Sequence, residues 1–412
     1  MRSLRNGVRA MPGSIAYNSY LLYSVRMSFD VERARRETPG CAEVVHFNNA
    51  GAALPPAVVT DTVVEYLRHE ALVGGYEAAA GAADRLDAVY ASVARLLGAG
   101  TDDVALTDNA TRSWQAVFYA LPFGPGDRIL TSQAEYASNA IAFLQVARRT
   151  GAVVEVIGDD ESGQLDVEEL RRRVDGDVKL IAVSHVPTQG GLVNPAEEIG
   201  AVAEAAGIPF LLDACQSAGQ LDLDVTRLKC DALSGTGRKY LRGPRGTGFL
   251  YVHPRLRERL EPAMLDLHSA SWQSPTEYVV DPTAKRFEVW ERDFAAVCGL
   301  GAAIDYALEW GLPAIEERVA SLAATLRDRL ADAGARVHDA GARKCGLVTF
   351  SLDGTPAAEI KARLAKANIN TSVSARTSAQ FDFTARDLPD LVRASVHYYN
   401  TEDEIDLLIR TL

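Results

Sequence analysis

Residues 210–251 read FLLDACQSAGQLDLDVTRLKCDALSGTGRKYLRGPRGTGFLY. An apolar run ends in an acid, Asp213, and a second apolar piece, Cys230–Leu233, leads into a glycine-rich segment that carries Lys239. A third apolar run follows at Phe249–Val252. Ligands of open α/β sheets bind outside the carboxyl ends of the strands. The order of these apolar runs along the chain therefore predicts that Asp213 and Lys239 lie together at one edge of a sheet.

Strands and helices alternate upstream of this segment. Apolar runs predict strands at 104–106, 128–131, 153–157 and 178–184, and helical spacing predicts helices at 83–97, 112–121, 138–150, 167–174 and 195–206. Such alternation favours an α/β fold with a mainly parallel sheet covered on both faces. Helices are predicted next at 295–310 and 312–333, then a smaller α+β region with a strand at 347–352 and helices at 357–365 and 402–412.

The domain organisation predicted from these patterns has four parts. Residues 1–26 form a flexible leader, or Met27 is the true start, because this segment contains arginine but no sustained apolar core. Residues 27–60 contribute to the active site and to the small domain. Residues 61–294 form the large domain, and residues 295–412 form the small C-terminal α+β domain.

Composition excludes several classes of protein. The formal net charge is −12, which gives no electrostatic case for binding nucleic acid or an anionic membrane. The five cysteines are scattered without metal-ligand spacing, and the histidines form no metal-like pairs, so no metal is assigned. An odd, unclustered set of cysteines favours reduced thiols and hence a cytoplasmic protein.

Lys239 is the first chemical candidate. A lysine that is held in place and partly desolvated has a lowered pKa and can condense with a carbonyl, although most lysines are simply solvated. A second candidate is the turn at Thr107–Thr111, which lies between a predicted strand and a predicted helix. Free backbone N–H groups at such a turn make a natural anion site.

Several ordered motifs together resemble the class V aminotransferase group of fold type I pyridoxal 5′-phosphate enzymes, which includes cysteine desulfurases, selenocysteine lyases, isopenicillin N epimerase-like proteins and C–S lyases. The motifs are Asp213-Ala-Cys-Gln216, Cys230-Asp231, Ser234–Lys239 and Gly243-Pro-Arg-Gly-Thr-Gly248. The resemblance spans nearly the whole chain, from His46–Ala52 to Arg393–Thr401. It implies a large domain with a seven-stranded type of sheet, a small C-terminal domain, and a homodimer with a shared active site.

The resemblance also implies roles for individual residues. Lys239 would be the Schiff-base lysine, and Asp213 would pair with the pyridinium nitrogen of the cofactor. Tyr136 falls where a ring-stacking histidine is usual; its reference pKa of about 10 makes proton transfer near neutral pH unfavourable. Further cofactor contacts are implied for Gln216, Ala110, Thr111, Thr236, Arg238, His185 and Thr188. Arg393 would bind the substrate α-carboxylate, with Arg376, Asn48 and Asn49 as further substrate contacts.

Two departures from the family pattern narrow the expected function. Desulfurases that form a persulfide carry a nucleophilic cysteine in the small-domain loop, but here residues 370–383 contain none. Because a thiolate is required for that step, a standard desulfurase is disfavoured. The second departure is Trp290–Glu291, where many relatives place a Gly-Thr pair that reaches the partner subunit's phosphate.

These residues predict a C–S β-lyase acting on an S-substituted cysteine, with a role in secondary metabolism. The motifs do not separate this reaction from epimerisation, transamination or decarboxylation-linked deamination of an amino acid. A catalytically silent scaffold homologue is a third reading, against which the joint presence of Lys239, Asp213, Gln216 and Arg393 weighs.

Overall fold

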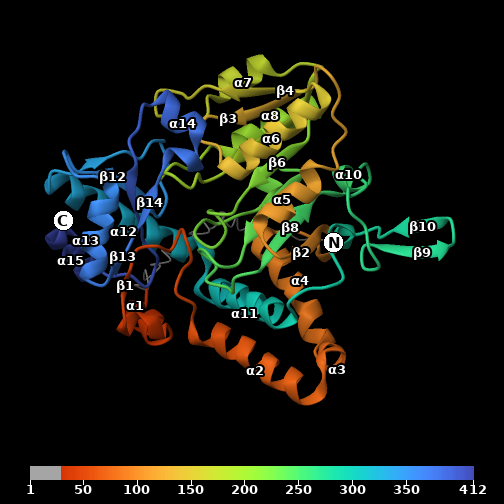
Figure 1. The fold of residues 1–412 in the computed structure, drawn as a ribbon, viewed down its shortest axis with the longest axis horizontal. Coiled ribbons are helices and arrows are strands. Elements are labelled where there is room, and N and C mark those ends of the chain that lie inside the picture. The colour runs from red at the N-terminus through yellow and green to blue at the C-terminus, as the bar shows by residue number, and fades with distance from the viewer. Residues whose placement is uncertain (1–28) are drawn as a thin grey trace, which may run out of the picture.

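The computed structural model describes residues 29–412 (Figure 1). The leader predicted at 1–26 and the proposed start at Met27 lie outside the described residues. Between residues 29 and 412, no helix combines the length and the apolar character that crossing a bilayer requires.

A seven-stranded sheet forms the centre of the larger part of the molecule (Figure 1). Its strands, in spatial order, are β2 (Val104–Thr107), β8 (Gly248–Val252), β7 (Ala232–Thr236), β6 (Phe210–Asp213), β5 (Val178–Ser184), β3 (Arg128–Ser132) and β4 (Val153–Ile157). The five strands from β7 to β4 are mutually parallel, whereas β8 is antiparallel to both of its neighbours. The α/β fold with a mainly parallel sheet is confirmed.

Helices cover both faces of this sheet because successive strand residues point to opposite sides. In β6, Leu211 packs with Trp114 and Phe143 of α5 and α6, whereas Leu212 belongs to the core on the other face. The helices of the larger part are α2 (Ala57–Val73), α3 (Gly75–Gly81), α4 (Ala83–Leu97), α5 (Ala110–Phe118), α6 (Ala137–Thr150), α7 (Val167–Arg173), α8 (Ala196–Ala206), α9 (Val225–Leu228), α10 (Pro254–Arg257) and α11 (Phe294–Trp310), with short 3₁₀ turns η2 (Thr101–Asp103) and η3 (Ala284–Phe287). A hairpin of β9 (Ala270–Ser274) and β10 (Glu277–Val280) projects from the molecule (Figure 1).

Two predicted boundaries near the site were wrong. The apolar piece at Cys230–Leu233 corresponds to β7, but β7 runs from Ala232 to Thr236 because the small residues after Leu233 are buried in it. A Cβ at Gly235 would lie 2.1 Å from the Phe249 ring, so glycine lets β7 and β8 pack closely. The helix predicted at 112–121 begins at Ala110, since the Asn109 side chain caps it by accepting from the Arg112 N–H at 3.0 Å.

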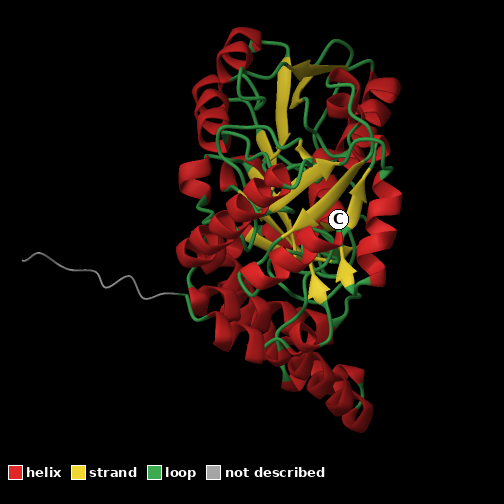
Figure 2. Cartoon of the chain, turned by 90° about the vertical axis from the view of Figure 1, so that its left-hand side faces the viewer, coloured by secondary structure: helices red, strands yellow, loops and turns green. Residues whose placement is uncertain are grey.

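A smaller α+β part contains a four-stranded antiparallel sheet (Figures 1 and 2). Its order is β11 (Arg336–Val337), β12 (Leu347–Ser351), β15 (Leu391–Ser395) and β14 (Ser372–Ser374). The helices are α1 (Val31–Arg36), α12 (Leu312–Asp332), α13 (Ala357–Lys366), α14 (Gln380–Ala385) and α15 (Glu402–Thr411), with η1 (Pro39–Ala42) and η4 (Arg376–Ser378). From the N-terminal side, β1 (Val45–His46) pairs in parallel with β13 (Ile369–Asn370).

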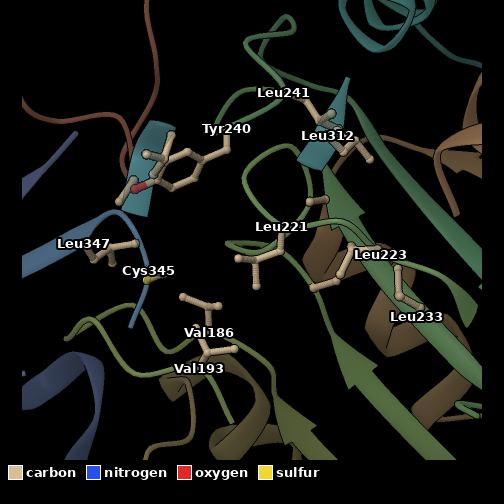
Figure 3. Close-up of a cluster of buried hydrophobic side chains, with 14 of the residues drawn as sticks. Val186, Val193, Leu221, Leu223, Leu233, Tyr240, Leu241, Leu312, Cys345 and Leu347 are labelled. Carbon is tan, nitrogen blue, oxygen red and sulfur yellow. The ribbon is translucent and has the colours of Figure 1, made fainter. Parts of the chain in front are cut away.

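Apolar side chains fill the junction between the two parts. Val186 and Leu221 lie on the large-sheet side, and Cys345 and Leu347 lie on the small-sheet side beside the Tyr240 ring (Figure 3). Helix α11 packs mainly against α2 and α4, although it falls on the small-domain side of the boundary predicted between 294 and 295. The division into domains therefore stays a prediction.

Arg242 joins the N-terminal segment to the C-terminal part. Its guanidinium is 1% exposed and donates to the Leu54 carbonyl at 2.8 Å, the Tyr398 hydroxyl at 2.6 Å and the Thr38 hydroxyl at 2.5 Å. It also lies 4.7 Å from the centre of the Tyr399 ring. No carboxylate among the described residues forms an ion pair with it, so neutral oxygens and aromatic faces hold this charge.

Candidate active site

A cavity of about 160 Å³ opens at the carboxyl ends of β5, β6 and β7. It is lined by Asn109, Ala110, Thr111, Tyr136, Ser184, Val186, Thr188, Asp213, Cys215, Gln216, Thr236, Arg238 and Lys239. The structure thus brings most of the predicted cofactor residues into one cavity, at the edge of the sheet where the sequence placed Asp213 and Lys239.

Lys239 follows β7 in a tight loop. The Gly243 N–H donates to the Gly237 carbonyl at 2.7 Å, and a Cβ at Gly237 would meet the Thr247 hydroxyl at 2.3 Å. Lys239 is 8% exposed, and burial lowers the pKa of its amine below the ordinary lysine value. The thiol of Cys215 is its neighbour, and burial raises the pKa of that thiol. A lysine in this setting is prepared to act as a neutral nucleophile and base.

Asp213 ends β6 and is 7% exposed. Its Oδ1 accepts from the Cys215 backbone N–H at 2.9 Å, and its Oδ2 accepts from the Asn139 amide at 2.9 Å. Each carboxylate oxygen is therefore held by one donor, and each keeps acceptor capacity for a further donor.

The first turn of α5 forms the anion-binding end of the cavity. Within the described chain, the N–H groups of Ala110 and Thr111 make no protein hydrogen bond, and they lie at the positive end of the helix dipole. A Cβ at Gly248 would lie 2.5 Å from the backbone carbon of Asn109 and 2.9 Å from the Ala110 nitrogen. Glycine at 248 thus allows β8 to support this turn.

Thr236 and Arg238 line the same cavity. The Thr236 hydroxyl donates to the Thr247 carbonyl at 3.1 Å, and the Arg238 guanidinium donates to the Gly51 carbonyl. Together these groups fit pyridoxal phosphate. Lys239 would bind its aldehyde, Asp213 would pair with its ring nitrogen, and the free N–H groups of the α5 turn would hold its phosphate.

Replacing Gly248 with alanine tests the cradle. We expect the added Cβ to push the turn at Asn109 and Ala110 out of place, with a stability loss of about 1–3 kcal/mol. Loss of one charge-assisted hydrogen bond to phosphate would weaken cofactor affinity by about 10–100-fold. Absorbance titration of the apoprotein measures this affinity. Gly81→Ala, where an added Cβ meets no atom within 4 Å, is the control; equal affinities for the two variants would contradict the cradle.

Arg393 lies beside the cavity on β15 and is 8% exposed. Its Nη1 donates to the backbone and side-chain oxygens of Thr188, at 2.8 and 2.9 Å. Its Nε has no partner, and its Nη2 is 3.4 Å from Asn48 Oδ1. Since Nε–H and Nη2–H lie on one edge of the guanidinium, that edge is available for a carboxylate.

Gln216 and Tyr136 also line the cavity. The Gln216 amide nitrogen donates to the Ala50 carbonyl at 3.1 Å and lies 3.4 Å from the Thr188 hydroxyl, so Oε1 is the atom left without a partner. The cofactor contact implied for Gln216 stays a prediction. Tyr136 caps α6 on the cavity wall, where its ring is half-buried.

Five predicted site residues do not line the cavity. Arg393 and Asn48 lie beside it, whereas the other three are turned away from it or lie at a distance. His185 is 4% exposed behind its wall, where burial lowers the pKa of the ring to about 3 and keeps it neutral. Asn49 is fully buried. Its amide nitrogen donates to the Ser395 carbonyl at 2.6 Å, and its amide oxygen accepts from the Tyr399 hydroxyl. Arg376 lies in η4, bonded to Leu388 O at 3.4 Å and 3.7 Å from Asp387 on the surface.

The cavity also contains residues that the sequence argument did not assign. Asn109, Ser184 and Val186 line it, as does Cys215. Asn109 had a usable signal, because asparagine before a helix is a strong capping residue. Among residues 29–412, no three His, Cys, Asp or Glu side chains gather in a way that could hold a metal ion.

Comparisons with known proteins converge on one group. The model of the family Aminotransferase class-V matches residues 44–408. A cysteine desulfurase of Serratia proteamaculans is 30% identical over 404 residues, covering 94% of this chain and 98% of its own. The apo structure of a cysteine desulfurase from Thermococcus onnurineus NA1 superposes with a TM-score of 0.86 at 27% identity, covering 92% of this chain and 96% of its own. The cystine C–S lyase C-DES, solved with its product cysteine persulfide, shares the fold with a TM-score of 0.82 at 24% identity, covering 91% of this chain and 98% of its own.

Proposed function

The chain belongs to the class V aminotransferase family, and we propose that it is a C–S β-lyase that cleaves an S-substituted cysteine. The family is pyridoxal phosphate-dependent, so this chain is a pyridoxal phosphate-dependent enzyme. Relatives named cysteine desulfurase support the broader class of enzymes that break a C–S bond. The observation that carries the proposal is the buried Lys239 amine facing the same 160 Å³ cavity as Asp213.

Lys239 would hold the cofactor through its amine. Once the substrate amine has replaced it there, the freed Lys239 amine would take the proton from Cα of the substrate. Burial lowers the pKa of its amine, so the neutral base forms at lower pH than for a solvated lysine. Bound pyridoxal phosphate supplies an electron sink for the pair left at Cα. Asp213 holds a proton at the ring nitrogen, which maintains that sink. The electron pair would then form the Cα–Cβ double bond as the Cβ–S bond breaks, and Lys239 would return its proton to the departing sulfur, which leaves as a thiol. Hydrolysis of the remainder would give pyruvate and ammonia.

The cysteine-free loop favours elimination over persulfide formation. The loop at residues 370–383 forms β14, η4 and the start of α14, and it contains no cysteine. Cys345 is 2% exposed and packs in the apolar junction beside Leu347 (Figure 3). Cys215 lines the cavity, but elimination needs no protein thiol.

The direct test is product analysis. Purified holoenzyme is incubated with S-alkyl and S-glycosyl cysteines, and thiol, pyruvate and ammonia are measured together. Equal amounts of all three support the proposal, and Cys215→Ala should retain thiol release. Ammonia or aldehyde without thiol identifies deamination, and loss of optical activity alone identifies an epimerase; either result overturns the lyase assignment. If the protein binds the cofactor but turns over no amino acid, the alternative of a catalytically silent scaffold is supported instead.

Arg393→Lys tests substrate carboxylate binding. Lysine retains the charge but not the fork of donors, and loss of one charge-assisted hydrogen bond raises KM by about 10–100-fold. Steady-state kinetics on the same substrate measure this. Arg376→Lys is the matched control, because Arg376 lies on the surface at η4. A larger KM change in that control would reverse the two assignments.

A homodimer is part of the proposal. Its support is a second cavity of about 410 Å³, bounded by α5 and by segments around Met264 and Val289. Met264, which lines this cavity, is 74% exposed, and Trp290, next to Val289 in the chain, is 52% exposed. Apolar patches of this kind mark association surfaces, and light scattering at micromolar concentration tests the stoichiometry. A cytoplasmic location, a role in secondary metabolism and the absence of nucleic-acid partners stay predictions.

A further inference from the structure

A second buried carboxylate lies behind Asp213. Glu135, in the loop between β3 and α6, is 1% exposed. Its Oε1 accepts from Tyr136 N–H at 2.8 Å, Asn139 Nδ2 at 2.9 Å and Ser184 Oγ at 2.5 Å. Its Oε2 accepts from Ser184 N–H at 3.0 Å and Thr131 Oγ1 at 3.1 Å. Five donors and no acceptor suit a carboxylate that accepts only, yet the chemistry above gives Glu135 no role.

Asn139 connects the two carboxylates. Its single amide nitrogen donates to Glu135 Oε1 and to Asp213 Oδ2, each at 2.9 Å. The amide has two hydrogens, so both are used in this bridge. Turning the amide over would place its oxygen against two acids. Glu135 therefore fixes the orientation of Asn139, and Asn139 fixes one oxygen of Asp213.

Burial and hydrogen bonding act on the charge of Glu135 in opposite directions, because its donors favour the ionised form. Burial raises the pKa of Glu135 to about 7, with the nearby Asp213 charge adding to the rise. The groups packed against Glu135 from β3, β5 and α6 are the neutral Thr131, Ser184 and Asn139.

We propose that Glu135 is a positioning residue that acts through the Asn139 amide to hold Asp213 against the ring nitrogen of the cofactor. The inference rests on the proposed function, because it needs the cofactor ring at Asp213. It extends that function by two residues that do not line the cavity.

The test reads the ring nitrogen directly. Holoenzyme is reconstituted with ring-¹⁵N pyridoxal phosphate, and the ¹⁵N resonance reports whether that nitrogen carries a proton. In Glu135→Gln, the resonance should move toward the unprotonated position, and kcat should fall about 10–100-fold with KM within threefold, which matches the loss of one charge-assisted hydrogen bond. Asn139→Ala should do the same while Glu135 keeps its Ser184 and Tyr136 donors. The double variant should be no worse than Asn139→Ala, because both act along one path.

Two controls separate the outcomes. Thr131→Val removes one donor to Glu135 without breaking the bridge, so its resonance should stay at the wild-type position even where its melting temperature falls. Asp213→Asn must move the resonance; if it does not, the cofactor placement and the proposed function fail. If Asp213→Asn moves it while Glu135→Gln and Asn139→Ala do not, only the positioning role is overturned. If Glu135→Gln does not fold, Asn139→Ala alone decides between these results.

Discussion

Lys239→Ala should abolish turnover, with a fall in kcat of at least about 10³–10⁴-fold. The variant loses the amine that holds the cofactor and the base that removes the Cα proton, and general acid–base catalysis alone contributes about 10²–10⁴-fold. The visible absorbance of the lysine-bound cofactor should disappear as well. Borohydride treatment followed by mass spectrometry should attach the cofactor to residue 239 in the wild type and leave no covalent label in the variant.

The control is Lys361→Ala, which removes an exposed lysine from α13. It should keep full activity and the wild-type spectrum. Retention of the lysine-bound spectrum by Lys239→Ala would place the covalent attachment elsewhere and remove the basis of the mechanism. Lys239→Ala leaves only a small cavity at one loop position, so the unfolding midpoint of this variant should remain close to that of the wild type. An unchanged midpoint would show that the variant has lost its chemistry and not its fold.

Arg242→Met should lower the free energy of unfolding by about 3–5 kcal/mol, because each buried acceptor left without its donor costs about 1–3 kcal/mol. Methionine fills similar length but leaves Leu54 O and the hydroxyls of Thr38 and Tyr398 without their donor. It also loses the contact between the guanidinium and the tyrosine faces. Chemical denaturation followed by tryptophan fluorescence measures the change.

Arg245→Met provides the comparison, since Arg245 is exposed three positions further along the same loop. Surface substitutions of this kind usually change stability by less than about 0.5 kcal/mol. Equal losses for the two variants would mean that Arg242 contributes as a surface cation does. Arg242→Lys should fall between the wild type and Arg242→Met, because one ammonium cannot reach three acceptors that point in different directions.

The sequence predicted the fold well because the strands of a parallel sheet are continuous apolar runs. The runs at 153–157, 178–184 and 210–213 match β4, β5 and β6. Errors arose where small polar residues continue a strand. Ser234, Gly235 and Thr236 look like a loop in sequence, but the approach of Phe249 over Gly235 buries them in β7. No local propensity encodes that approach.

The site could be predicted where a motif fixes the position of the backbone. It was harder to predict where the direction of a long side chain depends on its contacts. Asp213 and Lys239 follow strands directly, so their place at the sheet edge could be inferred. Asn49 lies one residue from Asn48, yet it turns inward to Ser395 and Tyr399, because the strand partner that decides its direction is far away in the chain. The Glu135–Asn139–Asp213 bridge was missed for a related reason: its members come from separate elements.

The pairing of β1 with β13 has a consequence for how the protein is made. His46 contacts Asn370, its partner in that pairing, across 324 positions of sequence. At ribosomal speeds of about 5–20 residues per second, the first strand waits roughly 16–65 s before its partner is synthesised. During that interval the backbone N–H and C=O groups of β1 are without their strand partner. A nascent chain halted before residue 369 should therefore bind a chaperone through residues 29–56, and release from that chaperone should follow synthesis of β13.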